Sequence, residues 1–207
     1  MIVAPSAAPA PAAAPPVLEA TTTIVIGSGF SALAVAAELN RQGVQAIVVD
    51  GPCALKQHSP IQPTTGGISL DELSERSEIV RLLEHYARRH ELDIRPETRA
   101  LELTRTQHGT PAARQWRVHT AQGTLSAHSV VFTRGALSQL RRVLHGLGVT
   151  TATELRASMQ ALGLYLVGVG DLAIPTTHEI LHQAKRASQS IASRVALCDP
   201  GPAAAVS

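Results

Sequence analysis

The chain has 207 residues, of which 44% are hydrophobic and only 2% aromatic, and its formal net charge is +2. This length is enough for one domain, or one and a fraction, with room for a hydrophobic core. The small net charge, the scattered arginines and the scarcity of aromatic residues argue against nucleic-acid binding. No apolar run approaches the roughly 20 residues of a membrane-spanning helix, so we expect no membrane segment.

The two ends of the chain differ from its middle. Residues 1–20 are rich in Ala and Pro and contain no Lys or Arg, which predicts a disordered leader rather than a signal peptide. Residues 198–207 are predicted to form a disordered tail, which leaves one folded domain over residues 21–197. The two cysteines, Cys53 and Cys198, are far apart and form no CxxC pair. This cysteine usage predicts a reducing, cytoplasmic location.

The first predicted elements are a strand, a glycine turn and a helix. The apolar run Ile24–Ile26 reads as a buried strand, residues 33–42 read as an Ala-rich helix, and Gly43 ends that helix. A short turn of the GxGxxA type joins the strand to the helix, and its residues are Gly27, Ser28, Gly29, Phe30, Ser31 and Ala32. Gly27 permits the sharp turn, Gly29 allows close approach to phosphates, and Ala32 packs the helix on the strand. Such a turn offers bare backbone N–H groups to a pyrophosphate.

A second predicted strand follows at Ala46–Val49 and ends at Asp50, which lies 18 residues beyond Ala32. A carboxylate near this spacing accepts hydrogen bonds from the ribose hydroxyls of a dinucleotide, and it repels a 2′-phosphate. The context therefore favours a dinucleotide site without NADP in this slot. The alternative is a βαβ unit that binds nothing.

The remaining predicted elements alternate between helices and strands. Hydrophobic periodicity and turn residues predict a loop over 51–69, helices over 74–90, 136–145, 153–161 and 176–195, and strands over 92–94, 99–106, 115–120, 124–127, 129–133 and 164–169. The pair Gln122-Gly123 predicts the hairpin turn before the strand at 124–127.

Four segments, taken in order, resemble the FAD-binding domain of flavin-containing monooxygenase-like and thioredoxin-reductase-like flavoprotein oxidoreductases. They are the turn with Asp50, the helix at 78–87 with the strands that follow it up to 120, the run Ser129–Gly135, and the run Gly163–Asp171. The resemblance covers most of residues 22–195. It implies an α/β, Rossmann-like three-layer domain with a central parallel sheet and a small antiparallel meander.

The resemblance also implies FAD as cofactor and a role for each matching residue. The turn would hold the pyrophosphate, Asp50 the adenosine ribose, and Gly170 with Asp171 the ribityl chain. Thr133 and Gly135 stand at the strand end where the family usually has Ala-Thr-Gly, although Arg134 separates them here. The last helix would point its positive end at the flavin. The implied function is FAD-dependent oxidoreduction, most like the monooxygenase branch, with no catalytic residue identified.

The chain departs from this family in one respect. Only about 30 residues separate Thr133 from the strand at 164–169, too few for the inserted NAD(P)H-binding domain, and no second GxGxxG turn is present. Electrons would therefore come from a partner protein, from a substrate, or from transiently bound NAD(P)H. The alternative is a non-catalytic dinucleotide-binding module or a degenerate remnant of the family.

A competing motif lies at the start of the last predicted helix. His178, Glu179 and His182 form an HExxH pattern, which is typical of zinc metallopeptidases. However, Thr176 and Glu179 also fit a capping box, and the apolar stripe of this helix leaves both histidines on the opposite face. A third ligand is hard to find, because only Asp199 follows. We therefore expect no metal site and keep the zinc peptidase as a minor alternative.

Overall fold

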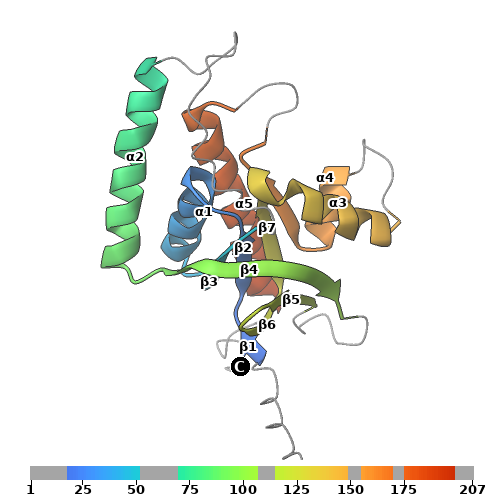
Figure 1. Cartoon of the computed structure of the whole chain (residues 1–207). Coiled ribbons are helices and arrows are strands. Elements are labelled where there is room, and N and C mark those ends of the chain that lie inside the picture. The colour runs from blue at the N-terminus through green and yellow to red at the C-terminus, as the bar shows by residue number, and fades with distance from the viewer. Residues whose placement is uncertain (1–17, 52–69, 107–114, 149–154, 170–174, 199–207) are drawn as a thin grey trace, which may run out of the picture.

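The computed structural model of the chain describes residues 18–51, 70–106, 115–148, 155–169 and 175–198 (Figure 1). Its elements, in chain order, are β1 (Leu18–Ala20), β2 (Thr23–Ile26), α1 (Phe30–Arg41), β3 (Ala46–Asp50), α2 (Leu70–Arg89), β4 (Asp93–Arg105), β5 (Trp116–Thr120), β6 (Gly123–Ala127), β7 (Ser129–Thr133), the short 3-10 helix η1 (Arg134–Ala136), α3 (Leu137–Gly146), α4 (Leu155–Ala161), β8 (Leu164–Val167) and α5 (Thr177–Cys198).

Five strands form the parallel centre of the sheet, in the spatial order β4-β3-β2-β7-β8. Every residue of β2 and of β7 is buried. Parallel strands that are covered on both faces carry nearly continuous apolar runs, because neither face meets water. This is why the run Ile24–Ile26 predicts a central strand correctly.

Strand β4 belongs both to this parallel centre and to the antiparallel meander. Its first residues, Asp93–Arg95, pair in parallel with β3, and residues Ala100–Arg105 pair antiparallel with β5. The sequence predicted two separate strands, 92–94 and 99–106, whereas the structure has one long strand with register shifts. Pro96 lies at the register shift within the parallel pairing, between the pairs Val49–Arg95 and Asp50–Arg99, and proline is tolerated at such irregularities because it cannot donate to the ladder. Strand β6 then pairs antiparallel with β5.

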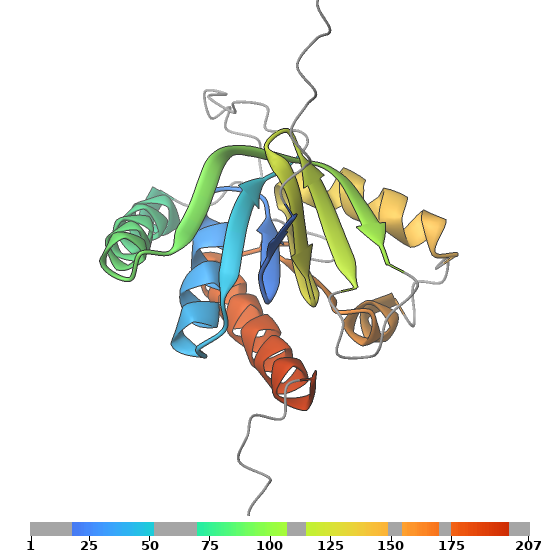
Figure 2. The same ribbon diagram turned by 90° about the horizontal axis from the view of Figure 1, so that it is seen from below.

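The sheet has a hydrophobic core on each face. On one face α1 and α5 lie side by side, and the core includes Val35, Val48, Val131, Ile180 and Ile191 (Figure 2). On the other face the meander, α3 and α4 cover the sheet, with Trp116, Phe132, Leu140 and Met159 in the core. Helix α2 packs against α1 at the outside of the molecule. The result is a three-layer arrangement of helices, parallel sheet and meander.

The first strand lies within residues 1–20, for which the sequence predicts a disordered leader. Leu18–Ala20 form β1, which pairs in parallel with β6 at the edge of the meander. At the other end, the sequence predicts that the tail begins at Cys198, but Cys198 is the last residue of α5. Three residues with a mixed exposure pattern carry too little periodicity to predict a strand, so only the tertiary pairing reveals β1.

The fold class predicted from the sequence is therefore confirmed: the domain is α/β and Rossmann-like, with a mostly parallel sheet and a small meander. Within the described parts of the chain, no helix is both long enough and apolar enough to cross a membrane.

Candidate dinucleotide-binding site

The predicted glycine turn follows β2 directly, and its first glycine is enclosed. Gly27 has a φ of 138°, and its N–H donates to the Val49 carbonyl at 2.8 Å. A Cβ atom on Gly27 would lie 1.7 Å from Thr133 Oγ1. The end of β2 therefore packs directly on the end of β7, and only glycine fits between them.

The second glycine of the turn is open to solvent. Gly29 is the N-cap of α1, with φ 76° and ψ −157°, and a Cβ atom there would meet no protein atom within 4 Å. No side chain caps α1, and its first turn carries no acidic residue. The first N–H groups of a helix have no partner within the helix, and the helix dipole makes that end positive. The start of α1 is therefore able to bind an anionic group such as a phosphate.

The other residues of the turn connect α1 to its neighbours. The Arg76 guanidinium lies over the Phe30 ring, 5.6 Å from its centroid. A Cβ atom on Gly168, just after β8, would lie 2.3 Å from Ser31 Oγ, so Ser31 packs on the end of that strand. Ala32 is buried, as predicted for the position where the helix packs on the sheet.

A cavity of about 400 Å³ lies beside the turn, between β3, β4 and α2. Gly27, Ser28 and Gly29 form one end of its lining, and Asp50 at the end of β3 also faces it. Burial raises the pKa of the Asp50 carboxyl, and the nearby Arg99 partly opposes this effect. The structure thus brings the turn and Asp50 together at one cavity.

The turn lies at the point where the sheet changes direction. From β2 the chain passes to β3 and β4 on one side, and β7 and β8 lie on the other side. Ligands of open α/β sheets bind at such a switch point, beyond the carboxyl ends of the strands. Thr133 ends β7 there, beneath Gly27. Gly135 is close to the end of β3, because a Cβ on Gly51 would lie 3.1 Å from the Gly135 carbonyl oxygen.

The predicted ribityl-binding residues, Gly170 and Asp171, lie outside the described residues. The strand that leads to them is held by a side chain that sequence reasoning missed. The Gly168 N–H donates to Gln183 Oε1 at 2.8 Å, and Gln183 Nε2 donates to the Val169 carbonyl at 3.2 Å. A glutamine within the amphipathic helix α5 gave no signal in the sequence that it would fix the end of β8.

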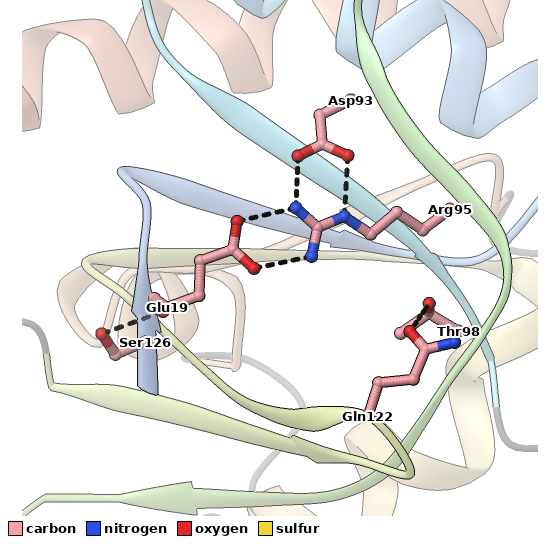
Figure 3. Close-up of polar contacts among 6 residues, drawn as sticks. All are labelled: Glu19, Asp93, Arg95, Thr98, Gln122 and Ser126. Atoms are coloured by element: carbon pink, nitrogen blue, oxygen red, sulfur yellow. Dashed lines mark hydrogen bonds and ion pairs between the residues drawn. The ribbon is translucent and has the colours of Figure 1, made fainter. Parts of the chain in front are cut away.

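An ion-pair network that no sequence motif indicates lies next to the cavity (Figure 3). Arg95, which lines the cavity, makes two hydrogen bonds of 2.7 Å to Glu19 and bonds of 2.8 and 2.6 Å to Asp93. The Arg95 guanidinium lowers the pKa of Glu19, chiefly by hydrogen bonding, and the two carboxylates raise the pKa of Arg95. The Arg95 guanidinium therefore bonds to Glu19 of β1 and Asp93 of β4. It connects the edge strand β1 to the wall of the cavity.

The HExxH pattern acts as a helix cap. The Thr176 N–H donates to Glu179 Oε2 at 2.8 Å, and the Glu179 N–H donates to Thr176 Oγ1 at 3.2 Å, which completes the predicted capping box. His178 and His182 are both exposed. Among the residues that the structure describes, no group of three or more His, Cys, Asp or Glu is arranged to hold a metal ion.

Comparison with known proteins yields structural matches alone. No family model matches the chain, and no curated protein matches it. A geranylgeranyl bacteriochlorophyll reductase-like protein from Thermoplasma acidophilum has a TM-score of 0.57 at 10% identity, and the match covers 90% of this chain and 81% of that one. This likeness spans nearly all of the domain and shows a shared fold.

Matches that cover less of the chain include a disulfide reductase and a flavin monooxygenase. The bacillithiol disulfide reductase from Staphylococcus aureus has a TM-score of 0.41 at 15% identity, over 56% of this chain and 39% of that one. The flavin monooxygenase from Stenotrophomonas maltophilia has a TM-score of 0.34 at 20% identity, over 56% and 38%. The chain spans about two fifths of the length of each of these relatives.

The fold that the resemblance implies is the fold that the structure has, and the Thermoplasma acidophilum protein shares it. The described residues between β7 and β8 form only η1, α3 and α4.

Proposed function

We propose that this chain binds FAD and acts as an FAD-dependent oxidoreductase of the monooxygenase-like kind. The observation that carries the proposal is the uncapped start of α1 at Gly29, which opens beside a cavity that Asp50 also lines. A pyrophosphate at the helix start and a ribose at a carboxylate are the two contacts that a dinucleotide needs in this type of fold.

The residues present fit this cofactor. A side chain at Gly29 would project into the space before α1, and glycine leaves that space free. The cavity of about 400 Å³ falls within the range of small-molecule sites and suits the adenosine half of a dinucleotide. Asp50 would repel a 2′-phosphate, so we propose FAD rather than NADP in this cavity.

The other assignments of the sequence analysis belong to the same proposal. Gly170 and Asp171 would hold the ribityl chain, and the start of α5 would face the flavin, which supplies the hydride or electron chemistry when it is bound. A partner protein or transiently bound NAD(P)H would supply electrons. We place this activity in the cytoplasm, in a domain that spans about residues 21–197.

The test is equilibrium binding of FAD to the purified full chain, followed by absorbance and flavin fluorescence. We expect saturable FAD binding with one flavin per chain, and much weaker binding of FMN, which lacks the adenosine and the second phosphate. Gly29→Ala is expected to weaken FAD binding at least roughly tenfold, because its methyl group occupies the space of the phosphate.

Gly43→Ala is the matched control, because Gly43 stands at the other end of α1 with a φ of 71° and equally open surroundings. It should bind FAD like the unmodified chain. If FAD binding is absent, or if Gly29→Ala and Gly43→Ala bind FAD equally, the proposed site is wrong. If FAD binds but no reductant ever bleaches it, the chain is a binding module and the oxidoreductase part of the proposal fails.

A further inference from the structure

Helix α2 presents one face to the protein and the other to solvent. Ala87 is buried, and Val80 and Leu83 are half-buried on the side that packs against α1. The helix runs along the outside of the molecule, beyond α1 (Figure 1). Its outer face is therefore available for contact with another molecule.

Five exposed residues follow this outer face at alternating spacings of three and four. We call them the α2 stripe: Glu75, Glu78, Leu82, His85 and Arg89. This spacing is that of the contact line of two packed helices. Leu82 stands at the middle of the stripe and is 68% exposed, a large apolar side chain flanked along the stripe by polar ones.

The α2 stripe is complementary to itself. When a second copy is placed antiparallel with Leu82 opposite Leu82, Glu75 falls opposite Arg89, and Glu78 falls opposite His85. Each pair occurs twice, as a two-fold axis requires. We propose that this chain forms a homodimer in which two α2 helices pack antiparallel along the α2 stripe, about a two-fold axis at Leu82.

A groove next to the stripe supports this docking. A cavity of about 930 Å³ lies over α1, between α2 and α5. Leu82, His85 and Arg89 line its α2 side, and His182 and Lys185 line its α5 side. The one acidic residue among its lining, Glu38, is paired with Arg41 at 2.8 Å. The groove is therefore basic and suits the acidic first half of the partner's α2.

The same helix supplies that acidic half. The first half of α2 carries Asp71, Glu72, Glu75 and Glu78 against the single cation Arg76, and the second half carries Arg81, Arg88 and Arg89 against the single acid Glu84. Residues 1–17 and 52–69 fit the groove less well, because they contain no Asp or Glu. The α2 helix of a second copy thus provides the acidic side chains that complement the basic groove.

The helix dipole alone does not account for this pattern. Acidic residues are favoured near the start of a helix and basic residues near its end, but that effect is confined to the first and last turns. It selects no particular face of the helix. The dipole explains neither the exposed Leu82 nor the alignment of opposite charges around it on one stripe.

The first experiment is sedimentation of the full chain over a range of concentrations, with charge-reversal variants. We expect a dimer that weakens as salt rises, because the paired charges lie at an exposed interface. Glu75→Arg and Arg89→Glu should each raise the dimer dissociation constant by roughly tenfold or more, because like charges then face each other. The double variant Glu75→Arg/Arg89→Glu should recover dimerisation, because each charge again faces its opposite.

The matched control is Arg81→Glu, which reverses an exposed charge of α2 outside the stripe. It should leave the dissociation constant unchanged. The second experiment places a cysteine on the axis in a background of Cys53→Ser and Cys198→Ser. Under oxidation, Leu82→Cys should form an intermolecular disulfide, and Arg81→Cys should not.

Three results would each overturn the proposal. One is a chain that remains monomeric at every concentration. Another is a dimer whose dissociation constant is the same in Arg89→Glu and Arg81→Glu. The third is a failure of the double charge reversal to restore what the single variants lose, in proteins whose circular dichroism shows an intact fold. None of these readouts depends on bound FAD, so they test the dimer separately from the proposed function.

Discussion

Gly27 and Thr133 are in contact across the switch point of the sheet. A Cβ atom on Gly27 would lie 1.7 Å from Thr133 Oγ1, and that hydroxyl donates to the Ile26 carbonyl at 3.3 Å. The buried threonine therefore supports the turn from below, whereas Gly29 faces the open side. The two glycines of the turn therefore have different roles. Gly27 is required for packing against Thr133, and Gly29 leaves space for a ligand.

Replacing Gly27 with alanine should destabilise the fold itself. Overpacking of a filled site costs about 1–3 kcal/mol, and the positive φ adds roughly 1–2 kcal/mol of strain. We expect Gly27→Ala to lower the free energy of unfolding by about 2–5 kcal/mol in a denaturant titration. Gly43→Ala, with positive φ but open surroundings, should show only the strain. Equal losses for the two variants would contradict the packing role of Gly27.

The Asp50 carboxylate should lower the stability of the cofactor-free protein at neutral pH and strengthen the binding of FAD. Burial raises its pKa in the folded protein, so the stability that the neutral carboxyl provides is lost as the pH rises through that pKa. We expect cofactor-free Asp50→Asn to be at least as stable as the unmodified chain at neutral pH, with the difference vanishing in acid. FAD binding should weaken roughly tenfold, as for a lost hydrogen bond to a charged group.

The measurements for Asp50 are thermal unfolding across pH and FAD titration. Glu102→Gln, at an exposed carboxylate of β4, serves as control and should change neither quantity. A variant that loses stability at neutral pH while it binds FAD normally would show that Asp50 has a structural role instead.

The ion pair between Glu19 and Arg95 should stabilise the position of β1 at the edge of the sheet, and this stabilisation should depend on pH. The pKa of Glu19 is lowered, so its contribution is present above the ordinary glutamate pKa and is lost as the pH falls. Since the Glu19 side chain is 42% exposed, we expect Glu19→Gln to cost about 1 kcal/mol at neutral pH. The cost should fade below about pH 4.

Hydrogen exchange of the β1 and β6 amides reads out this contact most directly. Faster exchange in Glu19→Gln should be confined to that edge of the sheet, and the parallel centre should be unaffected. Unchanged exchange at β1 would mean that backbone pairing alone holds the strand.

In the HExxH segment, we expect Glu179 to contribute to stability through the capping box, and we expect no zinc binding by the two histidines. Glu179→Ala is expected to reduce stability by about 1 kcal/mol, because the Thr176 N–H loses its acceptor. His178→Ala, at an exposed neighbouring position, should change stability by less than about 0.5 kcal/mol. Zinc should not raise the Tm of the unmodified chain. Stoichiometric zinc binding that His178→Ala abolishes would instead support the peptidase alternative.

Much of the site could be predicted from sequence because its residues are neighbours in the chain. The turn and Asp50 lie within one βαβ unit, where strand and helix periodicities fix their relative positions. Arg95, Glu19 and Gln183 could not be predicted in this way. Arg95 pairs with a residue 76 positions away, and Gln183 bonds to a strand end 14 and 15 positions away, through contacts that no local pattern records.

The sequence by itself determined the first strand–helix–strand unit with its glycine turn and most of the later helices and strands, because hydrophobic period and residue spacing act locally. Only the tertiary structure decided that β4 is a single strand shared by two parts of the sheet, that Leu18–Ala20 pair with β6, and that Gln183 holds the end of β8. These features depend on which distant groups meet, and burial and hydrogen bonding select them only in the folded chain.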